Sequence, residues 1–184
     1  MSAGAVEYIA IPIPLHGLAL RRFNVNGNQG LGHAGLVALM ELMPPTLEDL
    51  AFSDTSCGDT GMAAFMSVVP RLMHLRDVCC HTAPGISSEV WAGVWSALPQ
   101  LTALKCLRAE GCTGMGSAGT RALAVVVPQL PHTFVELDVH GCRINVEAAE
   151  ILRAAWGPRG NQLAGGFLGY ERNLGDIVDD IVPG

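Results

Sequence analysis

Residues 134–142 read FVELDVHGC, and the same pattern of apolar and polar residues occurs four times earlier in the chain. The earlier stretches read LRRFNVNGN from Leu20, LEDLAFSDT from Leu47, LRDVCCHTA from Leu75 and LKCLRAEGC from Leu104. Successive stretches begin 27, 28, 29 and 30 residues apart. Positions one, four and six are apolar and their neighbours are mostly polar, which is typical of a strand with one buried face. The sequence therefore predicts five short strands at a nearly constant spacing.

A loop and a stretch of helical periodicity follow each predicted strand, at residues 32–45, 59–70, 87–99, 116–128 and 145–158. Apolar residues recur three or four apart, as in Leu36, Leu39 and Leu42. Ser, Asp or Asn before the helices are candidate N-caps. Small residues are expected to let the helices approach the strand layer closely, at Gly35, Gly61, Gly119 and Ala148. A proline is predicted to end each helix at the same phase, at Pro44, Pro70, Pro99, Pro128 and Pro158.

This alternation resembles the leucine-rich repeat family, whose strand motif is LxxLxLxxN, and the helical version resembles its ribonuclease-inhibitor-like subfamily. The resemblance covers residues 20–156 and implies an α/β solenoid. The expected shape is a short curved arc with parallel strands on the concave side and helices on the convex side, in which each repeat is stable only when stacked on its neighbours.

The ninth position of the motif departs from the family. Asn28 is the expected asparagine, whereas Thr55, Ala83, Cys112 and Cys142 replace it. The family uses this side chain to bond backbone groups at the turn. Ala83 has no group that can do so, and the third repeat is therefore predicted to be irregular.

The chain is long enough for one domain, which we divide into three parts. Residues 1–19 are predicted to form an N-terminal cap or a degenerate repeat, since Val6, Ile9 and Ile11 fit the strand spacing. Residues 20–160 hold the five repeats of about 28 residues, the length implied by the resemblance. Residues 161–184 are predicted to be a C-terminal cap over the last repeat or a docking tail.

Composition excludes several classes of function. The chain of 184 residues is 49% hydrophobic, carries a net charge of −6 and has Lys105 as its one lysine, so no basic patch for direct contact with nucleic acid is expected. Its longest apolar run is too short and too broken by prolines to span a membrane, and its N-terminus does not fit a secretory signal. The six cysteines are interpreted as free thiols. We expect an intracellular protein of the cytoplasm or another reducing compartment.

The predicted strand phase places three rows of side chains on the concave face. The first row is Arg22, Asp49, Asp77, Cys106 and Glu136, the second is Asn24, Ala51, Cys79, Arg108 and Asp138, and the third is Asn26, Ser53, His81, Glu110 and His140. Arg108 is expected to pair with Asp77, Glu136 or Asp138. Partner contacts are predicted for Arg22, Asp49, Asp77, His81, Arg108, Glu110, Glu136, Asp138 and His140.

Two chemical alternatives arise on this face. His81, Glu110 and His140, with Cys79 and Asp138 next to them, are residue types that bind zinc, but they lack a known spacing signature, and a polar recognition surface is the favoured interpretation. Cys79 beside His81 is the nearest approach to a nucleophile with its base. The sequence contains no phosphate-binding glycine motif in the right context. We therefore expect no enzyme activity, metal or cofactor.

The leading hypothesis is a non-enzymatic module for protein–protein interaction that uses the concave face. The alternative is a structural subunit built permanently into a large multiprotein assembly. A third reading, a sensor fragment of a larger regulatory protein, has no nucleotide-binding motif to support it. Trp91 and Trp95 share one helix face, and an outward-pointing Trp91 would provide a second docking surface on the helix side, whereas an inward one belongs to the core.

Overall fold

The computed structural model of the protein describes residues 19–83 and 85–157. The predicted N-terminal cap up to residue 18, the C-terminal segment 161–184 and Pro158 lie outside the described residues. Within them, a strand and a helix alternate five times. The elements are β1 (Arg22–Asn24), α1 (Gly32–Leu42), β2 (Asp49–Ala51), α2 (Gly58–Val68), β3 (Asp77–Cys79), α3 (Ser88–Ala97), β4 (Cys106–Arg108), α4 (Gly116–Val126), β5 (Glu136–Asp138) and α5 (Val146–Trp156).

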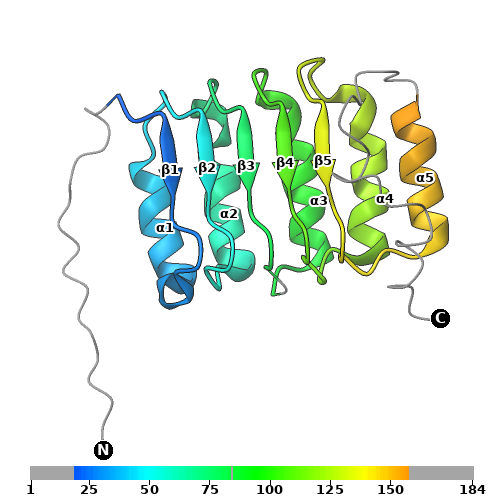
Figure 1. Cartoon of the computed structure of the whole chain (residues 1–184), viewed down its shortest axis with the longest axis horizontal. Coiled ribbons are helices and arrows are strands. Elements are labelled where there is room, and N and C mark those ends of the chain that lie inside the picture. Colours follow the sequence, from blue (N-terminus) through cyan, green and yellow to red (C-terminus); the bar gives the residue numbers. More distant parts are fainter. Residues whose placement is uncertain (1–18, 84, 158–184) are drawn as a thin grey trace, which may run out of the picture.

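All strands of the described chain lie parallel in one sheet, in the order β1-β2-β3-β4-β5. The helices lie side by side in the same order on one face of that sheet, and the sheet does not close on itself (Figure 1). The predicted fold class, an open α/β arc with strands on the inner side and helices on the outer side, is confirmed. No described helix has both the length and the apolar character needed to cross a membrane.

The register confirms the strand phase that the sequence predicts. Leu50 on β2 pairs with Phe23 and Val78 on its two neighbours, so position four of each repeat forms one continuous row. Leu50 and Val78 are 1% exposed, while Asp49 and Asp77 beside them are half-buried on the opposite face. Alternation along each strand thus separates an apolar layer under the helices from a polar layer on the open side.

The core between α3 and α4 contains two stacked tryptophans. Trp91 and Trp95 are both fully buried, with ring centroids 5.0 Å apart. Trp95 Nε1 donates a hydrogen bond to the Gly119 carbonyl of α4 at 3.0 Å, whereas Trp91 Nε1 has no hydrogen-bond partner among the described residues. The second docking surface that an outward Trp91 would have created is therefore absent from α3, because packing against the next repeat takes the indole inward.

The helix ends follow two schemes. Ser87 and Asn145 are N-caps as predicted, and their side chains accept from the backbone N–H groups three residues on. In contrast, α1, α2 and α4 begin at a glycine with positive φ and have no side-chain cap, at Gly32, Gly58 and Gly116. The prolines after α2, α3 and α4 do not end these helices abruptly. Each lies in a 3-10 turn that directly continues its helix, at Val69–Arg71, Leu98–Gln100 and Val127–Gln129.

Two of the four small residues singled out in the sequence, Gly61 and Gly119, lie close to the preceding helix. A Cβ atom on Gly61 would lie 3.0 Å from Leu36 Cδ2 of α1, and one on Gly119 would lie 3.4 Å from Trp91 Cβ of α3. These two glycines therefore permit close contact with the preceding helix, and the close approach of the helices to the strand layer stays a prediction.

In four of the five motifs the ninth residue caps the carbonyl of a sixth-position residue, either in its own repeat or in the repeat before it. Asn28 Nδ2 and Thr55 Oγ1 donate within their own repeats to the carbonyls of Val25 and Phe52, each at 2.8 Å. Since Ala83 has no donor, the Cys80 carbonyl of the third repeat instead accepts from the Cys112 thiol at 3.2 Å. Cys142 in turn donates to the Ala109 carbonyl of the repeat before it at 3.1 Å. The third and the fourth repeat are thus both capped by the repeat that follows, so this cap does not set the third repeat apart, and its irregularity stays a prediction.

Candidate functional site

The candidate site is the sheet face, which we define as the surface formed by the side chains of β1–β5 that point away from the helices. The register aligns Arg22, Asp49, Asp77, Cys106 and Glu136 as partners across the sheet. It aligns a second row of Asn24, Ala51, Cys79, Arg108 and Asp138 in the same way. These are the rows expected from the strand phase, whereas the role of their members in binding stays a prediction.

Two ion pairs bracket the sheet face. Arg22 Nε lies 2.8 Å from Asp49 Oδ2, and Arg108 Nε lies 2.9 Å from Glu136 Oε1. Of the three acidic candidates for Arg108, Glu136 is therefore its partner. All four side chains are at least a third exposed, so each pair contributes only about 0–1 kcal/mol to stability. The main effect of the pairs is to fix the orientation of two guanidinium groups.

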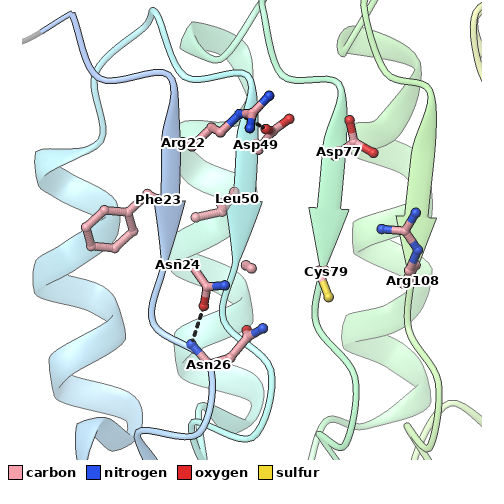
Figure 2. Close-up of a pocket in the computed structure, with 10 residues that line it drawn as sticks. Arg22, Phe23, Asn24, Asn26, Asp49, Leu50, Asp77, Cys79 and Arg108 are labelled. Atoms are coloured by element: carbon pink, nitrogen blue, oxygen red, sulfur yellow. Dashed lines mark hydrogen bonds and ion pairs between the residues drawn. The ribbon is translucent and has the colours of Figure 1, made fainter.

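Asp77 lies between these pairs, and none of the ion pairs among the described residues includes it. It lines a pocket of about 500 Å³ together with Asp49, Cys79, Arg22 and Arg108. Figure 2 shows the Asp77 carboxyl in the space between the Arg22–Asp49 pair and Arg108. Burial, followed by the neighbouring Asp49 carboxylate, raises the pKa of Asp77, and Arg108 only partly opposes this. The pocket therefore holds a carboxylate whose charge the protein itself compensates poorly.

We expect Asp77→Asn to stabilise the protein at pH 7 by up to about 1 kcal/mol, because it removes a carboxylate repelled by Asp49. A raised pKa in the folded state means that wild-type stability falls relative to the variant as pH rises through that pKa. The difference should disappear near pH 3, where Asp77 is protonated in both the folded and the unfolded chain. Urea unfolding at the two pH values measures this difference in stability.

Asp138→Asn is the control. The Asp138 carboxylate accepts the backbone N–H of His140 at 2.9 Å, so no gain in stability is expected from its replacement. An Asp77→Asn variant that is less stable than the wild type at pH 7 would contradict the conclusion that the charged Asp77 carboxylate destabilises the fold.

A second cluster occupies the C-terminal ends of the strands. The Cys79 thiol contacts His81 Nε2, and His81 Nδ1 lies 3.7 Å from Glu110 Oε2. His140, by contrast, is held by the bond from its N–H to Asp138 Oδ1. The described residues contain no group of three His, Cys, Asp or Glu side chains arranged to hold a metal ion. The zinc alternative therefore has no geometric support among these residues.

Cys106 departs from its expected place. Its register is that of the first row, but only 3% of it is exposed, so it is not available to a partner. Burial raises the pKa of its thiol, with Arg108 acting in the opposite direction. It forms part of the floor beneath the charged side chains.

Models of known protein families give no match to the sequence, and no curated protein matches it. Solved structures do match. The C-terminal domain of tropomodulin from Caenorhabditis elegans superposes with a TM-score of 0.66 at 11% identity, over 80% of this chain and 89% of that one. The actin-binding site 2 of leiomodin-1 gives a TM-score of 0.60 at 14% identity, over 75% and 79% of the two chains.

At these identities the likeness establishes a shared fold. It agrees with the repeat architecture that the sequence predicts, but it does not assign the chain to the ribonuclease-inhibitor-like subfamily.

Ser53 belongs to the third row of side chains but not to the set of predicted contact residues. It is 7% exposed, its Oγ accepts the His81 N–H at 3.0 Å, and the same oxygen lies 3.4 Å from Cys79 Sγ. Its own N–H donates to Asn26 Oδ1 at 2.7 Å. The sequence could have pointed to Ser53 as a candidate, since it occupies the same position of its repeat as His81.

Proposed function

We propose that the protein is a non-enzymatic module that binds a protein partner on the sheet face. The observation that carries the proposal is the pocket around Asp77, where an incompletely compensated carboxylate lies between two guanidinium groups held by ion pairs. A surface of fixed alternating charges favours register and specificity in a protein interface more than raw affinity. The nine predicted contact residues remain the candidates for direct contact with the partner.

The chemistry of the pocket favours a basic side chain from the partner. An arginine or lysine inserted beside Asp77 would supply the positive charge that this carboxylate lacks. Arg22 and Arg108 at the margins would then meet acidic groups of the partner. Asp77→Asn, which we expect to stabilise the chain, should therefore also weaken binding.

Actin is the first defined partner to test, because one structural neighbour is named as an actin-binding site. The other expected partner class is any protein that presents a basic residue next to acidic ones. Binding to monomeric actin is measured by fluorescence anisotropy and binding to filaments by co-sedimentation, with mass-spectrometric identification of captured proteins for other partners.

The decisive comparison exchanges charges without changing the net charge. Arg108→Glu with Glu136→Arg reverses one ion pair on the sheet face, and Arg121→Glu with Glu147→Arg reverses the matched pair between α4 and α5, whose Arg121 Nη2 and Glu147 Oε2 lie 2.8 Å apart. We expect the first exchange to abolish partner binding and the second to leave it unchanged, with the same thermal midpoint in both. Equal binding by both exchanged proteins would exclude the sheet face as the docking surface.

A further inference from the structure

We propose that Cys79 is a site of reversible covalent modification, at which its thiol forms a mixed disulfide with a low-molecular-weight disulfide such as oxidised glutathione. The inference goes beyond partner docking, and the reaction needs no partner. It rests on how Cys79, His81, Glu110 and Ser53 lie around one sulfur atom.

The first part of the argument is the contact between the thiol and an imidazole. Cys79 Sγ lies against His81 Nε2, which can take the thiol proton. On the other side of the ring, His81 Nδ1 lies 3.7 Å from Glu110 Oε2, and a carboxylate there favours the ring orientation that turns Nε2 toward the thiol. The order of groups is that of a nucleophile, its base and the carboxylate that orients the base.

The second part is the environment of the sulfur. Ser53 Oγ already accepts the His81 N–H at 3.0 Å and lies 3.4 Å from Cys79 Sγ, so its hydroxyl hydrogen is placed to donate to a thiolate. Arg108 is the direct partner of Cys79 across β3 and β4, and both line the same pocket. A hydrogen-bond donor beside the sulfur, and access to a pocket that also carries a guanidinium, favour a reactive cysteine.

The third part is the contrast with the remaining cysteines of the chain. Each of the other five is at most 3% exposed, while Cys79 is half-buried and reaches the pocket. The Cys112 and Cys142 thiols donate to backbone carbonyls, and burial raises the pKa of Cys112 to about 12. These thiols are structural, so a disulfide reagent in solvent should meet Cys79 alone.

The proposed step is a thiol–disulfide exchange. The proton of Cys79 moves to His81 Nε2, and the thiolate attacks one sulfur of oxidised glutathione. The disulfide bond of the reagent breaks as the bond between Cys79 and one glutathione sulfur forms. The departing glutathione thiolate takes the proton back from His81, and excess free thiol reverses the reaction.

The experiment treats the full folded chain with oxidised glutathione and follows adduct formation by intact mass and peptide mapping. We expect one glutathione per chain, on Cys79, with no adduct in Cys79→Ser. His81→Gln should slow the reaction by about ten-fold or more, because the thiol loses its base. His140→Gln is the matched control, since it changes a histidine at the same position of another repeat, whose imidazole contacts no thiol among the described residues. Its rate should equal that of the wild type.

Two further measurements keep the test decisive. If thermal melting shows that His81→Gln perturbs the fold, Glu110→Gln, at a side chain that is 50% exposed, replaces it and should also slow the reaction. Iodoacetamide is a small alkylating reagent that shares no structure with glutathione. It should alkylate Cys79 before the other cysteines of the native protein. Modification of another cysteine before Cys79, or an unchanged rate in both variants, would overturn the proposal whether or not a partner binds the sheet face.

Discussion

Trp95→Ala lowers the free energy of unfolding by about 3–5 kcal/mol, the range for truncating a fully buried aromatic side chain. The indole of Trp95 is completely buried, stacks on Trp91 and donates to the Gly119 carbonyl, so truncation opens a cavity and removes that hydrogen bond. Because Trp95 packs α3 against α4, the stability is lost in the middle of the repeat array. Urea unfolding followed by circular dichroism measures it.

Two controls separate the causes of that loss. Ser96→Ala changes the next, exposed residue and should be almost neutral. Trp95→Phe keeps most of the apolar contact but removes the bond to Gly119, whereas Trp91→Phe removes a donor that has no partner among the described residues. The first phenylalanine variant should therefore be less stable than the second by about 1 kcal/mol. The reverse order would contradict the assigned hydrogen bond.

Cys112→Ala is expected to cost about 1–3 kcal/mol, although it removes only one sulfur atom. The Cys112 thiol provides the cap of the Cys80 carbonyl, and Ala83 has no side-chain group to replace it. Cys142→Ala is the matched control and should cost less, because the Ala109 carbonyl keeps the Cys112 N–H at 3.4 Å. Thermal and urea unfolding compare the two variants.

A second substitution tests the cause directly. Ala83→Asn, added to Cys112→Ala, places a donor where Asn28 and Thr55 cap the carbonyls of their own repeats. We expect the double variant to regain most of the lost stability. If it does not, or if both cysteine variants lose the same amount, the thiol acts through packing alone.

The strand phase was predictable because one face of each strand is buried. Leu50, Val78 and Leu107 mark that face by their spacing, and parallel register then aligns Asp49 with Asp77 without further information. The fold class followed for the same reason. For Arg108 the sequence predicted three possible acidic partners but not which of them forms the ion pair. That depends on side-chain rotamers, which sequence spacing does not specify.

Several features depended on contacts between repeats and could not be read from one repeat alone. Both tryptophans of α3 point inward because the next helix presents Gly119 to them. The eighth position of each motif has positive φ in every described repeat, including Asp54 and Thr82, where a glycine would be expected. The cluster around Cys79 depends on Ser53 and Glu110, which belong to the preceding and the following repeat.

The two capping schemes make the array directional. The caps of Val25 and Phe52 come from their own repeats, so losing a neighbour leaves them intact. The thiols that cap the Cys80 and Ala109 carbonyls come from the following repeat, so opening a repeat removes a hydrogen bond from the one before it. Unfolding should therefore spread inward from the C-terminal end more readily than from the N-terminal end, and amide hydrogen exchange should show protection graded along the chain in that sense.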